Sequence, residues 1–277
     1  MHIAAPIARK VSLIIHAPTI PSEAGRRVQQ IFGWNDPDQL VAHFISDMRS
    51  ASYGIVNYQV VERFEVDAFP LKAAGFRYQA EEYAALWRRR AGFHQPDLVD
   101  YSTLLNEFDT LQRVQNGAID EVWLMGFPYG GYYESRMAGP GSFWCNSPPL
   151  DAWEAAGRRF VVMGFNYERG VGEMMESYGH RTESILTKVH ERVGGPENLW
   201  ERFTRYDQRN PGRAEVGNIH FAPNSERDYD WGNRRVVPSA CDDWYDFPTL
   251  PGHTRMVDCS EWGNGDIRLH HVWWYRH

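Results

Sequence analysis

The residues with the clearest chemical potential are three glutamates and a histidine at helical spacing between residues 172 and 189. Glu173, Glu176, His180 and Glu183 are separated by three, four and three positions, so an α-helix would place them close together on one face. A carboxylate four residues before a histidine can orient the imidazole or bind a metal ion together with it. The residue order is neither H-E-x-x-H nor H-x-x-E-H, so no known zinc peptidase motif is present.

Gly179 gives this helix a second unusual feature, because it directly precedes His180. A glycine inside a helix costs roughly 1 kcal/mol relative to alanine. We therefore predict that Gly179 allows another segment to approach the helix closely. The alternative interpretation is a solvated acidic face that contains one histidine, which is what most charged runs are.

A second histidine would have to come from another part of the chain, and His220 is the best candidate. It lies on a short apolar segment between Gly217 and Pro223. With His180 and one carboxylate it would form a Zn²⁺ or Fe²⁺ site with an open position, and without metal the same groups would act as general acid and base. A divalent metal is thus a candidate cofactor, and the carboxylates considered for this role are Glu134, Glu168 and Glu173.

The apolar pattern predicts the elements that position these groups. Strands alternating with helices favour an α/β fold with a mostly parallel central sheet and flanking helices, a Rossmann-like three-layer arrangement. Buried strands are predicted at 10–16, 55–66, 119–125 and 160–163, and helices at 35–48, 80–90, 101–114 and 172–189.

The residue composition changes after Gly194-Gly195-Pro196, and regular apolar patterns become rare. We assign residues 1–195 to the α/β core domain, and 196–277 to an irregular extension rich in Trp, Pro and Gly that packs against it as part of one structural unit. One further helix is predicted near 197–207.

In an open parallel sheet, ligands bind beyond the carboxyl ends of the strands. One such end is followed by a glycine–tyrosine stretch, 126–136, which has neither G-x-x-x-x-G-K-[ST] nor G-x-G-x-x-G and therefore disfavours a nucleotide site. Its glycines can also be explained by tight turns alone. The predicted catalytic and orienting residues are His180, Glu134, Glu168 and Glu176, and the predicted substrate-binding residues are Tyr129, Tyr133, Asn166, Tyr167 and Arg169.

Composition narrows the possible partners. The formal net charge of −7 argues against nucleic acid, and no apolar run approaches the roughly 20 residues that span a bilayer. The amino end has no signal-peptide pattern, which favours a cytoplasmic protein, the alternative being a secreted one whose leader is absent from this chain. An aromatic share of 14%, with 11 Trp, suits either a core or a platform for ligands.

The cysteines leave alternatives open. Cys241 and Cys259 are either a disulfide or two buried thiols. Cys145 is a weaker candidate for a nucleophile, because its apolar neighbours indicate a buried and unreactive thiol.

We expect the chain to be a hydrolase of a peptide, amide or similar polar substrate, with a His/Glu site at the carboxyl edge of the sheet that acts with or without a metal ion. One alternative is a non-catalytic module that binds a glycan or small molecule on its Trp/Tyr-rich surface. Another is a biosynthetic isomerase or cyclase that uses the same groups as acid and base.

Overall fold

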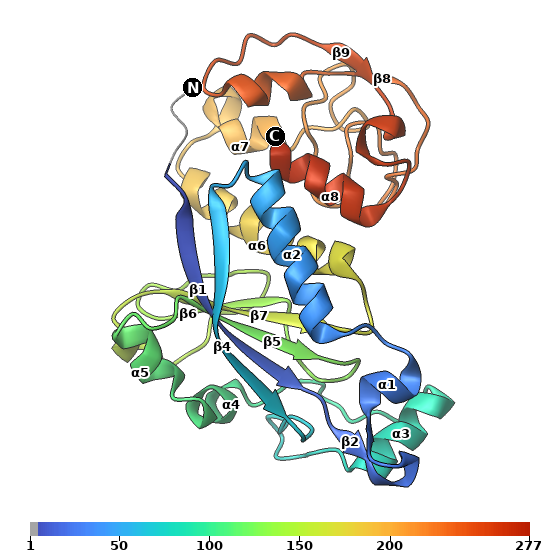
Figure 1. Ribbon diagram of the computed structural model, residues 1–277. Helices are drawn as coiled ribbons and strands as arrows, with labels where there is room; N and C mark the ends of the chain where they lie inside the picture. Colours follow the sequence, from blue (N-terminus) through green and yellow to red (C-terminus); the bar gives the residue numbers. More distant parts are fainter. Residues whose placement is uncertain (1–4) are drawn as a thin grey trace. The chain divides into compact units, whose positions relative to one another are not determined.

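The chain divides into two compact units in the computed structural model, which describes residues 5–277 (Figure 1). The sheet unit contains Pro6–Ile45 and Asn57–Gly170, and the C-terminal unit contains Ser46–Val56 and Val171–His277. The domain division at residue 195, made from composition, stays a prediction.

A five-stranded sheet with the order β4-β1-β5-β7-β6 organises the sheet unit. β5 pairs in parallel with β1 and with β7, whereas β6 runs antiparallel to β7. This confirms a mixed α/β fold with a mostly parallel central sheet. The strands are β1 (Ile7–His16), β4 (Val56–Val66), β5 (Glu121–Gly126), β6 (Ser135–Ala138) and β7 (Phe160–Asn166).

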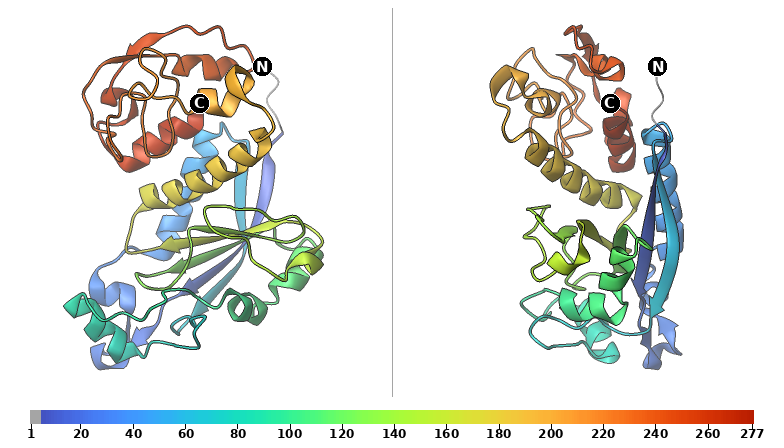
Figure 2. Two further views of the ribbon diagram at one scale, coloured as in Figure 1. Left: turned by 180° about the vertical axis from the view of Figure 1, so that it is seen from behind. Right: turned by 90° about the vertical axis from the view of Figure 1, so that its left-hand side faces the viewer.

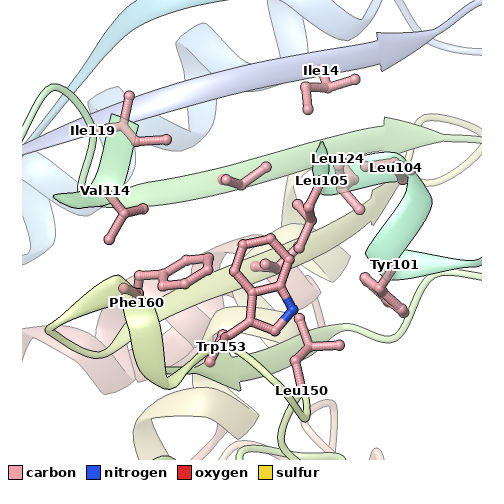
Figure 3. Packing of buried hydrophobic residues seen from close by; sticks show 14 of the residues in the cluster. Ile14, Tyr101, Leu104, Leu105, Val114, Ile119, Leu124, Leu150, Trp153 and Phe160 are labelled. Atoms are coloured by element: carbon pink, nitrogen blue, oxygen red, sulfur yellow. The ribbon is translucent and has the colours of Figure 1, made fainter. Parts of the chain in front are cut away.

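Helices cover both faces of the sheet, as the alternation of side chains along β5 shows. Val122 and Leu124 belong to a buried cluster that also includes residues of α4 (Tyr101–Glu107) and α5 (Thr110–Gln115) (Figure 3). Trp123 points to the opposite face, where its ring packs edge-on against that of Phe44 of α2 (Pro37–Ala51), with the ring centroids 5.3 Å apart. The sheet unit therefore has helices on either side of its strands, as a three-layer α/β fold requires (Figure 2).

Two predictions about local structure in this unit were wrong. The single helix expected at 101–114 is broken into α4 and α5, because Asp109 adopts a left-handed conformation with φ of 50°. Residues 135–138, where no strand was predicted, form the antiparallel strand β6. Four residues next to a glycine-rich stretch are too short a run for periodicity to reveal.

The remaining elements of the sheet unit are short, and most of them come between β1 and β5 in the sequence. They are β2 (Thr19–Ile20), the 3₁₀ helix η1 (Pro21–Glu23), β3 (Arg26–Arg27), α1 (Val28–Phe32), α3 (Ala80–Arg89) and the 3₁₀ helix η2 (Glu154–Ala156).

The C-terminal unit is built on the long helix α6 (Val171–His190), which packs against α8 (Ile267–Arg276). Its aromatic core includes Trp231, Trp244 and Trp262 together with Trp273 and Trp274 of α8. The helix predicted near 197–207 is shorter and spans only Leu199–Phe203. The other elements are the 3₁₀ helices η3 (Gly195–Glu197), η4 (Cys241–Asp246) and η5 (Cys259–Trp262), the helix α7 (Leu199–Phe203), and the paired strands β8 (Val237–Ser239) and β9 (Arg255–Val257).

Among the described residues, 5–277, none of the helices is both long and apolar enough to cross a membrane.

Candidate metal centre

Helix α6 presents the predicted glutamate and histidine in the C-terminal unit. Glu176 is 7% exposed, and the side chain of His180, one turn later, is 18% exposed. A Cβ atom on Gly179 would lie 2.4 Å from Cδ1 of Ile219, closer than any real contact. The structure thus confirms that Gly179 permits another segment to approach, and that segment carries His220.

The turn that carries His220 is held by its own polar groups. Gly217 has φ of +87°, and a Cβ there would lie 2.1 Å from the carbonyl oxygen of Phe221, so the turn requires glycine. The side-chain oxygen of Asn218 accepts hydrogen bonds from the backbone N–H groups of His220 and Phe221, each at 3.0 Å. The backbone therefore fixes the direction in which the His220 ring leaves the turn.

Both histidines converge on the carboxylate of Glu176. Nε2 of His220 lies 3.0 Å from Oε1 of Glu176, and Nε2 of His180 lies 3.8 Å from the same oxygen. The two rings are nearly perpendicular, with centroids 4.6 Å apart. One ligand atom from each residue lies within 4.8 Å of the others, while two atoms bound to one Zn²⁺ at about 2.0–2.2 Å are separated by roughly 3–3.6 Å. A small movement of His180 would therefore complete the set.

A second carboxylate faces the other nitrogen of each ring. Nδ1 of His180 lies 3.1 Å from Oε2 of Glu183, and Nδ1 of His220 lies 3.0 Å from Oδ1 of Asp228. Histidines that bind metal through one nitrogen commonly donate the other N–H to such a group, which fixes the tautomer and the ring orientation.

The charges of this cluster do not balance with neutral rings. A neutral imidazole has one N–H, so it can donate to only one of the two carboxylates that face it. A second proton on His220, or a cation shared with Glu176, would satisfy both carboxylates that lie 3.0 Å from its nitrogens, whereas Nε2 of His180, at 3.8 Å from Glu176, is beyond hydrogen-bond distance. Burial alone would raise the pKa of Glu176, but hydrogen bonds from His180, His220 and Tyr229 outweigh it and hold that pKa well below its usual range.

Glu183 connects the two histidine-bearing segments. Besides facing His180, it accepts a hydrogen bond through Oε1 from the backbone N–H of Ile219 at 3.0 Å. His271 of α8 is fully buried, with Nδ1 3.1 Å from the carbonyl oxygen of Gly172 and Nε2 3.3 Å from that of Ile219. Burial lowers the pKa of His271 to about 4, so this ring is neutral at pH 7 and donates its single N–H to one of these two carbonyl oxygens. The ring lies between α6 and the His220 turn.

Sequence reasoning identified part of this centre. It found His180, His220 and Glu176, although it gave Glu176 an orienting role and offered Glu134, Glu168 or Glu173 as the third ligand. The spacing of Glu183 from His180 was visible in the sequence. Asp228 and Tyr229 follow His220 in an irregular segment, where no periodic signal marks them.

The other predicted catalytic and substrate-binding residues lie in the sheet unit, at or beyond the ends of β5 and β7. Tyr129 stacks on Phe93 with ring centroids 3.5 Å apart. Tyr167 is fully buried, and its hydroxyl donates to the carbonyl oxygen of His16 at 2.9 Å.

The polar residues around them also have protein partners. The carboxylate of Glu134 accepts from the Asn146 amide, the Tyr133 backbone N–H donates to the Tyr101 hydroxyl at 2.7 Å, and the Asn166 side chain accepts from the backbone N–H of Glu168 at 2.9 Å. The Arg169 carbonyl oxygen accepts from the Asn35 amide at 3.0 Å. These contacts position the residues, and the catalytic and substrate-binding roles assigned to them stay predictions.

The cysteines are buried free thiols, including Cys241 and Cys259, which are not bonded to each other. Cys241, Asp242 and His277 also lie close enough to share an ion. Burial raises the pKa of Cys241 to about 11, and Arg255 already donates to both oxygens of Asp242. Because a metal needs a thiolate and an available carboxylate, this second group fits a metal poorly.

Comparison of the sequence with protein-family models, of the sequence with curated proteins, and of the fold with solved structures gave no match. The interpretation of the site therefore depends on its geometry.

Proposed function

We propose that Glu176, His180 and His220 bind one divalent metal ion and that the chain is a metal-dependent hydrolase. The observation that carries the proposal is the arrangement of the two rings, each with a carboxylate at Nδ1 and with Nε2 directed at Glu176. A divalent cation between the two Nε2 atoms and Glu176 would compensate the carboxylate charges without requiring two imidazolium ions.

The donor set indicates which ions fit. Two imidazoles and one carboxylate are the protein ligands of many catalytic zinc sites and also of non-haem iron sites, and both leave positions for water. A bound zinc ion lowers the pKa of its water towards 7 and polarises a carbonyl group. Hydrolysis is the simplest reaction that uses this chemistry.

The protein residues have distinct roles in this proposal. Glu183 and Asp228 keep a proton on Nδ1 of each histidine, so that Nε2 presents its lone pair. With both Nε2 atoms on the metal, the positive charge of the ion would keep Glu176 ionised, and the hydrogen bond from Tyr229 acts in the same direction. The side chains of His180 and His220 are 18% and 24% exposed, which gives water and a substrate access to the centre.

For the substrate we propose a peptide, an amide or a similar polar molecule, because histidines dominate this centre whereas a glycoside hydrolase uses a pair of acids. A catalytic role for Glu134 and Glu168 at the carboxyl edge of the sheet is a separate proposal, because both residues belong to the sheet unit and the metal centre belongs to the C-terminal unit. The Rossmann-like description of the fold and a cytoplasmic location are also proposals.

A second candidate function is general acid–base catalysis without metal, as in an isomerase or cyclase. It is favoured by the direct contact of 3.0 Å between His220 Nε2 and Glu176 Oε1, which a proton on Nε2 would explain. Under this alternative, chelators leave activity unchanged.

Calorimetric titration of the chelator-treated full chain with Zn²⁺ and with Fe²⁺ under nitrogen tests the proposal. We expect one site per chain for at least one of the ions, with the affinity lost in His180→Ala and His220→Ala variants and retained in a His253→Ala control, since His253 is exposed in the same unit. If wild-type protein binds neither ion, or if the His220→Ala variant binds as tightly as wild type, the metal centre is wrong. Hydrolysis is then measured on a panel of amides and peptides with and without the bound ion.

A further inference from the structure

The C-terminal unit also contains a polar cavity of about 390 Å³ that does not include the metal centre. Its wall comes from the end of α7 and the residues that follow it, from 212–215, and from 250–254 directly before β9. More of this wall is polar than apolar, and none of Glu176, His180 and His220 belongs to it. The volume is within the range of small-molecule sites, which is about 300–1,000 Å³.

Hydrogen bonds within the protein hold the segments of this wall in place. The backbone N–H of Glu215 donates to the carbonyl oxygen of Arg205 at 3.0 Å, which joins two of the segments. The third segment is attached through Gly252, whose backbone N–H donates to Oδ2 of Asp243 at 2.5 Å. The cavity is therefore preformed, and a ligand would not have to order these segments when it binds.

Three arginines line the cavity, and Arg202 is the one that pairs with acids of the protein. Its Nε lies 2.8 Å from Oε1 of Glu215, and its Nη2 lies 3.7 Å from Oδ2 of Asp243. Both carboxylates are buried, and the indole N–H of Trp244 donates to the other oxygen of Glu215 at 3.0 Å. The guanidinium and the two carboxylates together leave one negative charge, which is fixed in the wall.

The other two arginines of the cavity are Arg205 and Arg213, and neither has a carboxylate partner among the described residues. Their two positive charges exceed the one negative charge left in the wall, although the chain as a whole has a net charge of −7. Thr254, exposed on the same wall, adds a hydroxyl group. Because a guanidinium presents five N–H donors in a planar fork that fits the oxygens of carboxylates and phosphates, the cavity favours an oxyanion.

We propose that this cavity binds a small molecule that carries a phosphate group. Arg205 and Arg213 bind the phosphate oxygens, and the hydroxyl of Thr254 is a further donor. A phosphate monoester matches the two unpaired guanidinium charges and offers three strong acceptor oxygens, whereas one carboxylate offers a single charge and two oxygens. The cavity is larger than a phosphate ion, so it has room for the organic part of the ester. The site is independent of the metal centre, and metal removal leaves it intact.

Calorimetric titration of the chelator-treated full chain with glycerol 3-phosphate tests this proposal, with glycerol and succinate as comparison ligands. Physiological ionic strength suppresses non-specific attraction between exposed charges. We expect saturable binding of one glycerol 3-phosphate, weaker binding of succinate and no binding of glycerol. Absence of saturable glycerol 3-phosphate binding at millimolar concentration would overturn the proposal. Succinate bound as tightly as glycerol 3-phosphate would also overturn it, because the cavity would then select carboxylates equally well.

Arginine substitutions test the location of the site. Arg205→Gln and Arg213→Gln should each weaken glycerol 3-phosphate binding by about three- to tenfold, between the effect of an exposed ion pair and that of a buried charge-assisted hydrogen bond. The double variant should abolish binding. Arg234→Gln, at an exposed arginine of the same unit outside the cavity, should bind as wild type does. Circular dichroism confirms that the variants fold, and unchanged affinity in the double variant would show that the phosphate binds elsewhere and overturn the proposal.

Discussion

The sheet unit and the C-terminal unit use polar side chains in different ways. Beyond the sheet edge, the hydroxyl of Tyr167 donates a hydrogen bond to the His16 carbonyl oxygen, and the ring of Tyr129 stacks on Phe93. In the C-terminal unit, Glu183 and Asp228 face one nitrogen of their histidines while Glu176 faces the other. The side chains of the first arrangement pack on and bond to the protein itself, whereas those of the second direct ligand atoms of three residues at one place. Regular secondary structure thus predicts a general place for ligands, whereas the convergence of Glu176, His180 and His220 provides a specific candidate centre.

The largest expected effect is a loss of metal affinity, which should follow a substitution in the C-terminal unit but not one in the sheet unit. Glu176→Gln should lower the affinity for Zn²⁺ by at least about 100-fold, because it removes a charged ligand and leaves two imidazoles alone. Glu134→Gln in the sheet unit should leave the affinity within about twofold of wild type. Calorimetric titration measures both, and similar losses in the two variants would contradict the assignment of the centre to the C-terminal unit.

A smaller loss is expected when the carboxylates at Nδ1 are neutralised. Asp228→Asn and Glu183→Gln should each lower metal affinity by about 10–100-fold, the range typical of groups that orient a ligand. Glu183→Gln should have the greater effect, since Glu183 also accepts the backbone N–H of Ile219. Unchanged affinity in both variants, measured by competition with a chromogenic chelator, would show that the carboxylates do not act on the metal.

Replacing one glycine by alanine in each unit compares the two units by how closely their segments pack. A Cβ on Gly164 of the sheet unit would lie 2.3 Å from the backbone oxygen of Tyr133, and one on Gly179 would lie 2.4 Å from Ile219 Cδ1. We expect Gly164→Ala and Gly179→Ala to lower the free energy of unfolding by about 1–3 kcal/mol, as overpacking usually does, in urea denaturation. Only Gly179→Ala should also weaken metal binding, because it displaces the residue before His220.

Two buried histidines should make both units less stable in acid. Burial lowers the pKa of His16 in the sheet unit and of His271 in the C-terminal unit to about 4. Below the unfolded-state pKa of about 6.5 the unfolded chain takes up protons that the folded chain does not, so stability falls with falling pH until about pH 4. Each histidine should cost about 1.4 kcal/mol between pH 7.5 and 5.5.

Urea denaturation at those two pH values measures this loss. His16→Phe and His271→Phe should each reduce the pH dependence, whatever their effect on absolute stability. A pH dependence that neither substitution alters would show that other groups cause it.

Part of this organisation was predictable from the sequence because it depends on local pattern. The apolar runs gave β1, β4, β5 and β7, and the spacing of Glu176 and His180 placed them on one helix face. The break at Asp109 and the short strand β6 depend on tertiary contacts that periodicity does not record. For the same reason the partnership of His220 with Asp228 was not predicted, since its geometry comes from an irregular turn held by Asn218, Glu183 and His271.

The central claim is that Glu176, His180 and His220 share one metal ion, and anomalous diffraction from crystals grown with Zn²⁺ tests it most directly. We predict a single strong peak at the zinc edge, about 2.0–2.2 Å from Nε2 of both histidines and from a carboxylate oxygen of Glu176. A map without a peak at this position, with His220 still hydrogen-bonded directly to Glu176, would contradict the claim.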